Sequence, residues 1–128
     1  MCLYLTSSEP KVAKKKVRCY KILLKDMTSP FFLKQYYLGA TETSAIERNF
    51  KAIQEGLHTY SDLKQATKAY NDYYTKKFGK GCVLVECFIP EGATYYVGTS
   101  ECNPYPDDVL ILDSYASDKL LLNKIIKH

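Results

Sequence analysis

Apolar residues in this chain gather in short runs separated by glycine, proline and polar residues, and their spacing predicts strands in some segments and helices in others. The segment 17–25 is rich in apolar residues between polar flanks, which predicts a strand. The run 82–89 is almost wholly apolar and predicts a strand at the centre of a sheet. Shorter strands are predicted at 57–60, 94–97 and 109–112, with a final strand or mixed segment at 119–126. The polar segment 99–108 contains two prolines and is predicted to be a loop.

Two segments have the spacing of helices. In 44–55, apolar residues recur three and four positions apart, so they share one face. The same spacing in 62–77 predicts a second helix, with Ser61 placed to cap its start. The aromatic stretch 31–38 is predicted to be a short strand or a packed loop.

The order of these elements predicts one α+β domain. We expect a mixed, mostly antiparallel sheet of about five or six strands with two helices. Residues 1–16 are predicted to be an extended basic arm, and 17–128 the domain itself. A chain of 128 residues fits a single domain that can bury a core without disulfides or a structural metal.

The charge distribution and the aromatic content bear on what kind of partner the chain could bind. The chain has 12 tyrosines and no tryptophan, and tyrosine suits both half-buried strands and binding surfaces. The net charge is +4, and the positive charge is concentrated in the first 25 residues, which contain several lysines and Arg18 but only one acidic residue, Glu9. Such a segment could contact phosphates or an acidic partner. Arg18 and Arg48 are the only arginines, however, and this scarcity argues against nucleic acid as the partner.

The cysteines show no metal-binding pattern. The five cysteines include no CxxC pair, and only His58 and His128 are available beside them, so we expect no metal site. Strand cysteines are expected to be buried and inert, although Cys2 as an N-terminal nucleophile and a thiol acting with His58 stay open. Reduced thiols and the absence of an apolar leader or an 18-residue apolar run predict a cytoplasmic protein without membrane contact.

The segment 56–70 carries the clearest candidate chemistry. His58 and Tyr60 stand at the end of a predicted strand, immediately before a helix N-terminus that favours a phosphate or carboxylate. His58 could serve as an acid, a base or a hydrogen-bond donor there. The alternative is that His58 is a packed strand residue with no chemical role.

This segment resembles the ADP-ribosyltransferase-like families. The resemblance is carried by Gly56 to Tyr60, by Gln65-Ala66 in the following helix and by Val83 to Phe88 in the next strand. Arg18-Cys19-Tyr20 occupies the place of the opening-strand motif, in which a basic residue stands beside an aromatic one.

The resemblance implies a pocket for NAD or another nucleotide. Arg18, Tyr20 and His58 would bind the ligand, and Tyr60 and Tyr70 would stack on the nicotinamide. The catalytic acid implied by the family is Glu101, with Glu86 as the second candidate.

We therefore expect a small cytoplasmic ligand- or partner-binding domain with an ADP-ribosyltransferase-like fold. It could be a phage or mobile-element protein that binds a nucleotide or blocks a host protein. One alternative is an active NAD-dependent ADP-ribosyltransferase, so enzymatic activity is open. The second alternative is a nucleic-acid-associated module that uses the basic N-terminal segment. Self-association is also open.

Overall fold

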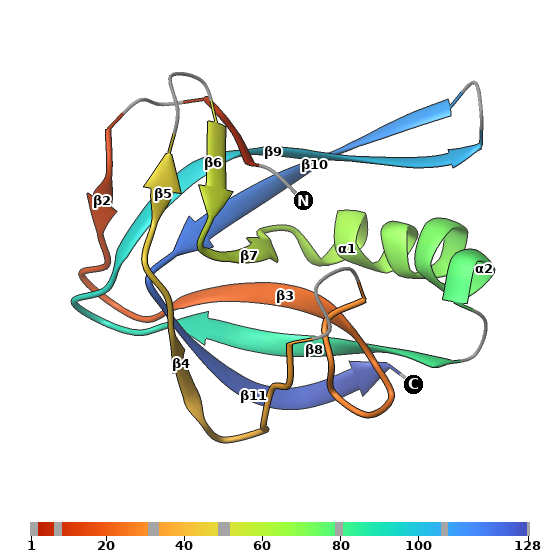
Figure 1. The fold of residues 1–128 in the computed structure, drawn as a ribbon, viewed down its shortest axis with the longest axis horizontal. Coiled ribbons are helices and arrows are strands. Elements are labelled where there is room, and N and C mark those ends of the chain that lie inside the picture. Colours follow the sequence, from red (N-terminus) through yellow and green to blue (C-terminus); the bar gives the residue numbers. More distant parts are fainter. Residues whose placement is uncertain are drawn as a thin grey trace.

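One curled antiparallel sheet dominates the structure, a computed structural model that describes residues 3–6, 9–30, 34–48, 52–78, 81–105 and 108–127 (Figure 1). Within these residues the sheet has eleven strands: β1 (Leu3–Leu5), β2 (Lys11–Val12), β3 (Val17–Leu24), β4 (Thr41–Thr43), β5 (Glu47–Arg48), β6 (Ala52–Glu55), β7 (Leu57–Tyr60), β8 (Cys82–Ile89), β9 (Thr94–Tyr105), β10 (Asp108–Ser117) and β11 (Lys119–Lys127). The strand order is β4-β11-β8-β3-β7-β10-β9-β1-β6-β5, with β2 added to β9.

The sheet consists of two halves that meet at a seam between β3 and β7. On one side of this seam, β3 pairs with β8 at eight consecutive positions from Val17 to Leu24. On the other side, β7 pairs with β10 along its whole length. Across the seam, the register joins the two strands at a single pair, Tyr20 with Tyr60. The seam is therefore a weakly closed junction between two well-paired half-sheets.

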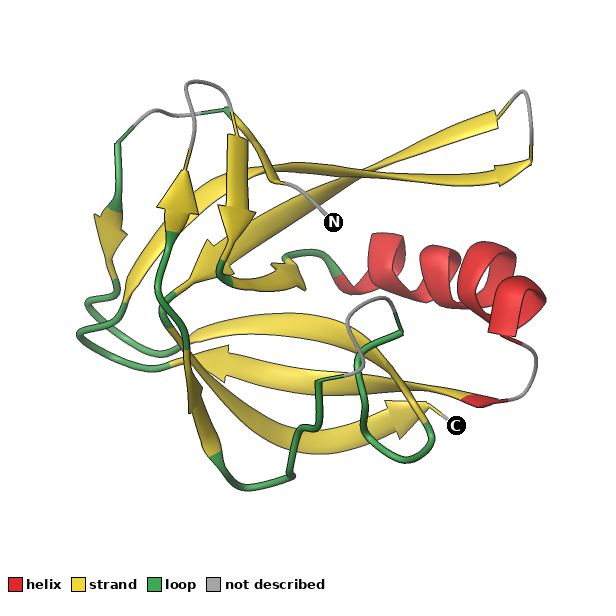
Figure 2. Ribbon diagram, in the orientation of Figure 1, coloured by secondary structure: helices red, strands yellow, loops and turns green. Residues whose placement is uncertain are grey.

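A single helical segment lies against the seam, between the β9–β10 hairpin and the half-sheet that contains β3 and β8 (Figure 2). It runs as α1 (Leu63–Ala69), the π-helical turn η1 (Tyr70–Tyr74) and α2 (Thr75–Phe78). Asp62 caps its start, because the Asp62 carboxylate accepts a hydrogen bond from the Gln65 backbone N–H at 3.0 Å.

The period-two alternation of β3 separates the two main apolar clusters. Cys19 and Leu23 point into a cluster with residues of β8 and β11. Tyr20 and Ile22 point to the opposite face and pack with residues of the helical segment. The helix thus covers one face of the half-sheet, as its tyrosine-rich side predicts.

The prediction of an α+β domain with five or six strands and two helices is wrong. The predicted helix at 44–55 contains strands β5 and β6 instead, with 49–51 outside the described residues. Ile53 lies opposite Leu3 and Ala52 opposite Tyr4, so β1 supplies the partner that makes this segment a strand. The apolar spacing cannot show that partner, because it lies some fifty positions away in the sequence.

The prediction of a loop at 99–108 is also wrong. β9 continues to Tyr105 and β10 begins at Asp108, with 106–107 outside the described residues. The buried Ser100 hydroxyl donates to the Ser114 hydroxyl across the hairpin at 2.8 Å. A polar run can remain a strand when its buried hydroxyls satisfy one another.

The remaining predicted elements are strands or helix as expected. The strands at 17–25, 57–60 and 82–89 and the helix at 62–77 are confirmed, and β8 lies between β3 and β11 as a central strand should. Segment 1–16, predicted as an extended arm, contributes β1, which lies between β9 and β6, and β2, which pairs with β9.

The aromatic stretch 31–38 is expected to be a short strand or a packed loop. Residues 31–33 are outside the described part, and Gln35 makes an isolated bridge with Thr28.

Among the described residues, no helix has both the length and the apolar character needed to cross a membrane.

Candidate functional site

A cavity of about 290 Å³ opens at the seam, where β3 and β7 separate. Beyond the Tyr20–Tyr60 pair, β3 runs on toward Leu24 while β7 runs back toward Leu57 without further pairing between them. The cavity fills this separation and is also bounded by the segment after β3. The side chains that matter for binding are Lys21, Lys34, Tyr36, His58, Tyr60 and Tyr74.

Backbone groups of β3 face the cavity. The Lys25 N–H bonds the Gly81 carbonyl beside β8, whereas the Leu24 N–H bonds the Thr28 carbonyl on the other side. Because backbone direction alternates along a strand, the N–H and C=O of Ile22 point away from β8 and toward the seam. The pocket therefore presents one backbone donor and one backbone acceptor from β3.

Lys21 bridges the separation between the two strands. The Ser61 N–H bonds the Asp113 carbonyl of β10, so the same alternation turns the backbone of His58 toward β3. The Lys21 Nζ donates to the His58 carbonyl oxygen at 2.8 Å. In a regular β-ladder a backbone N–H of β3 would bond the His58 carbonyl. Here the Lys21 side-chain amine bonds it instead.

The environment of Lys21 weakens its hold on a proton. Burial lowers the pKa of Lys21 from its ordinary value of 10.5 to about 8, and the nearby Lys34 charge acts in the same direction. Thiolates at Cys87 and Cys19 would oppose this shift. Burial raises the pKa of Cys19 to about 12 and that of Cys87 still further, so both thiols are neutral near pH 7. A pKa of about 8 leaves about a tenth of Lys21 as the neutral amine at that pH.

Tyr36 forms an aromatic wall close to two cations. Its ring centroid lies 5.2 Å from the Lys21 Nζ and 5.4 Å from the Lys34 Nζ, distances at which a ring face attracts a cation. Burial, followed by the Glu42 carboxylate, raises the pKa of Tyr36 to about 12, so the phenol stays neutral. Lys34 forms an ion pair with Glu42 at 3.7 Å and keeps a side chain that is 41% exposed.

Tyr60 and Tyr74 close the cavity from the helical side. Their hydroxyls lie 2.8 Å apart, and both residues are buried. Tyr74 belongs to the π-helical turn, and its carbonyl oxygen accepts a hydrogen bond from the Cys82 thiol at 3.7 Å. The π turn therefore connects β7 and β8 through one tyrosine, at the kind of helix irregularity that often marks a functional position.

Of the six predicted site residues, the structure brings His58 and Tyr60 to this cavity. Tyr20 is buried in the core beneath the helix, paired with Tyr60 at the seam. The hydroxyl of the proposed stacking partner Tyr70 donates to the Cys82 carbonyl at 3.1 Å. Glu101 is exposed on β9, opposite Ile111 of β10. Tyr20, Tyr70 and Glu101 are not among the residues that line the cavity.

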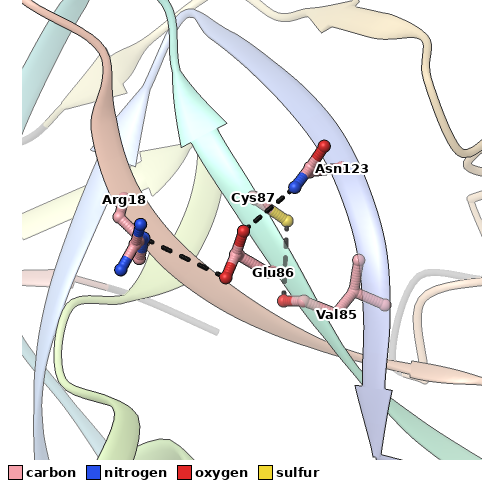
Figure 3. Close-up of polar contacts among 5 residues, drawn as sticks. All are labelled: Arg18, Val85, Glu86, Cys87 and Asn123. Carbon is pink, nitrogen blue, oxygen red and sulfur yellow. Dashed lines mark hydrogen bonds and ion pairs between the residues drawn. The ribbon is translucent and has the colours of Figure 1, made fainter.

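Arg18 belongs to a separate polar cluster with Glu86 and Asn123, on the adjacent strands β3, β8 and β11 (Figure 3). Its Nε lies 4.0 Å from the Glu86 carboxylate, which also accepts a hydrogen bond from the Asn123 amide at 2.9 Å. Glu86, the second candidate acid, is therefore held between β3 and β11 and does not line the cavity. A surface ion pair of this length contributes little to stability.

Sequence reasoning did not single out Lys21, Lys34, Tyr36 or Tyr74. A signal for Lys21 existed, because it interrupts the apolar run of β3 at a position flanked by buried residues. Lys34 and Tyr36 lie in a segment without regular structure, so no periodicity pointed to them. Their approach to Lys21 depends on the path of the chain after β3.

The described cysteines and carboxylates offer no metal centre. No group of three or more potential metal-ligating side chains gathers within the described residues. Cys19, Cys82 and Cys87 are free and buried, and burial raises the pKa of each thiol. Buried neutral thiols are poor nucleophiles. Cys2, the other candidate nucleophile, lies outside the described residues.

Comparisons with family models, curated proteins and solved structures gave no significant match to this chain. The argument for function therefore starts from the cavity itself.

Proposed function

We propose that this chain is a small-ligand-binding protein whose seam pocket takes a small anionic molecule with a flat body, the class that includes mononucleotides. The observation that carries this proposal is the 290 Å³ cavity, which combines two lysines with an aromatic wall. A largely preformed concavity with a few convergent polar groups is the usual form of a small-molecule site.

Charge favours an anion. Lys21 and Lys34 both approach Tyr36, and among the described residues that line the pocket Glu55 is the one carboxylate. A phosphate or carboxylate near Lys34 would relieve the repulsion between the two amines, because it would place a negative charge beside them. The Lys34–Glu42 ion pair is partly exposed, so a ligand anion can compete for that cation at little cost.

Shape and backbone favour a flat ligand. The ring of Tyr36 supplies a stacking surface, and Ile22 supplies a backbone donor and acceptor directed at the seam. A heteroaromatic ring that carries both an acceptor and a donor on one edge could bond these groups as a strand would. The volume lies near the lower limit for ligand sites, which favours a mononucleotide-sized molecule or smaller over a dinucleotide.

An NAD-dependent transferase has less support. Tyr70 and Glu101, the residues that such an activity would need beside Tyr60, do not line the cavity. Binding without catalysis accounts for the residues that do line it. We further propose a cytoplasmic location, because the described thiols of Cys19, Cys82 and Cys87 are free, as in reducing compartments.

Thermal unfolding with a panel of mononucleotides, NAD and aromatic carboxylates tests this proposal. A ligand at a hundred times its Kd should stabilise the fold by about 2.7 kcal/mol and raise the Tm measurably. Lys34→Gln should reduce the shift, because it removes a half-exposed cation of the pocket without disturbing the core. Lys25→Gln is the matched control, since Lys25 is exposed and outside the pocket.

Two results would contradict the proposal. The first is that no member of the panel changes the Tm. The second is that the shift survives Lys34→Gln but disappears when Lys14, Lys15 and Lys16 are neutralised. That outcome, with a steep salt dependence, would favour the nucleic-acid alternative.

A further inference from the structure

We propose that Lys21 is a reactive amine that forms a reversible imine with a small aldehyde or 2-oxo acid bound in the seam pocket. The inference rests on the proposed function, since it assigns a chemical class to the ligand of the same pocket. It adds a covalent step that anion binding alone does not require.

The first observation is the position of the amine. Lys21 extends from a fully paired strand into a cavity large enough for a small molecule, and its Nζ is held by the His58 carbonyl at 2.8 Å. A fixed amine at the wall of a pocket loses little side-chain entropy when it attacks a bound carbonyl. An exposed lysine such as Lys25 has no such fixed position.

The second observation is that the hydrogen bond to His58 survives the reaction. A neutral amine carries two N–H groups, and a protonated imine keeps one. That remaining N–H can continue to donate to the His58 carbonyl oxygen, so the strand acceptor stays satisfied in the product. The geometry therefore accommodates the adduct without a lost hydrogen bond.

The third observation is the set of groups around the amine. The titratable groups beside Lys21 are Lys34 and Tyr36 from the segment after β3 and the thiols of Cys19 and Cys87 from β3 and β8, and the pocket lining adds His58 from β7 and Glu55 from β6. None of these thiols or the phenol carries charge near pH 7, since burial raises the pKa of each. Desolvation together with a neighbouring cation is the arrangement that activates lysine nucleophiles.

The reaction balances without an external oxidant or reductant. The Lys21 nitrogen forms a bond to the carbonyl carbon, and one amine proton moves to the carbonyl oxygen to give a carbinolamine. A proton from solvent then allows that oxygen to leave as water, and the protonated imine remains. Lys34 is placed to pair with a carboxylate of the bound molecule, which explains the preference for an acid that also carries a carbonyl.

Glyoxylate with cyanoborohydride at pH 7.5 is the test, because the hydride converts an imine into a stable secondary amine that peptide mass spectrometry locates. The neutral fraction of Lys21 at this pH is roughly two hundredfold larger than that of an ordinary lysine, given a pKa of about 8 in place of 10.5. We expect labelling at Lys21 to be at least about tenfold faster than at Lys25, and to saturate with glyoxylate concentration.

Lys21→Arg is the informative variant, because arginine keeps a cation and a donor for the His58 carbonyl but does not form the imine. This variant should lose the fast, saturable labelling and retain its folded circular dichroism spectrum. Lys25→Arg, the matched control, should leave the labelling of Lys21 unchanged. If Lys21→Arg does not fold, the ratio of Lys21 to Lys25 labelling in the wild type still shows whether Lys21 is selectively reactive.

Equal labelling of Lys21 and the exposed lysines, or slower labelling of Lys21, would overturn the inference. Its failure is distinguishable from failure of the proposed function. A nucleotide-induced rise in Tm together with an unreactive Lys21 would leave a pocket that binds without covalent chemistry. Absence of any nucleotide shift together with selective labelling would instead leave the amine reactive and remove the nucleotide as ligand.

Discussion

The hydroxyls of Tyr60 and Tyr74 lie 2.8 Å apart in the buried wall of the seam pocket, which joins the last residue of β7 to the π-helical turn. This contact fixes the helix against the weakest junction of the sheet, where β3 and β7 share one residue pair. Pocket shape and helix position are therefore linked through two side chains.

Removing either hydroxyl of this pair should destabilise the fold. We expect Tyr60→Phe and Tyr74→Phe each to lower the free energy of unfolding by about 1–2 kcal/mol, because the other hydroxyl loses a buried partner. The double variant should cost less than the sum of the two, which urea denaturation of the four proteins would show. Tyr73→Phe is the control, since the Tyr73 hydroxyl bonds the Lys77 amine at the exposed surface. Additive losses would mean that the two hydroxyls act independently.

Stability should depend on pH through Lys21. Its folded pKa of about 8 lies below the ordinary 10.5, so the unfolded chain binds more protons between these values and stability rises with pH across them. Comparison of the wild type with Lys21→Met isolates this contribution. Between pH 8 and 10.5 the difference in unfolding free energy should move in favour of the wild type by about 2 kcal/mol, after allowance for a half-buried amine.

The thiols and tyrosines act in the opposite sense at high pH. Burial raises the pKa of Cys19 to about 12 from an ordinary 9, so its contribution is lost as pH rises from 9 to 12. Lys21→Met keeps the same thiols and tyrosines, so most of this loss cancels in the difference. The Lys21 charge lowers the pKa of Cys19, which leaves a remainder above pH 9. A difference that stays flat from pH 8 to 10.5 would show that Lys21 has an ordinary pKa.

Gly98 should tolerate no side chain. A Cβ at this position would collide with the Tyr4 carbonyl oxygen and lie 2.9 Å from the Leu3 Cγ, because β1 pairs with β9 there, with Leu5 opposite Gly98. We expect Gly98→Ala to displace β1 and to increase amide hydrogen exchange at Leu3–Leu5. Gly81→Ala is the matched control, since its Cβ would meet no atom within 4 Å. Unchanged exchange in Gly98→Ala would mean that β1 adapts at no cost.

The N-cap of the helix should be measurable on its own. Asp62→Ala removes the acceptor for the Gln65 N–H and should lower stability by about 1 kcal/mol. Lys64→Ala, two residues further along and exposed, should have a much smaller effect. Chemical denaturation of the three proteins compares them directly, and equal stability of Asp62→Ala and the wild type would contradict the capping role.

A third of the candidate site, two of its six binding side chains, was accessible from local sequence pattern. His58 and Tyr60 were found because a short apolar strand immediately precedes a capped helix, and both features depend on neighbouring residues in the sequence. Tyr70 shares the apolar face of that helix with Tyr74. The Tyr70 hydroxyl donates a hydrogen bond to the Cys82 carbonyl and does not reach the pocket. Helical spacing identifies the face that is buried, but it does not say which tyrosine on that face reaches a cavity.

The sequence by itself determined the strands with strong apolar character and the tyrosine-rich helix, because these depend on interactions between near neighbours. Only the tertiary structure decided that 52–55 is a strand, because its partner β1 lies far away in the sequence. It also decided that β9 and β10 form a long hairpin, because each strand completes the backbone hydrogen bonding of the other. The pocket is likewise a feature that only the tertiary structure decides. It exists because β3 and β7 pair once and then diverge, and Lys21 enters the gap that this divergence leaves.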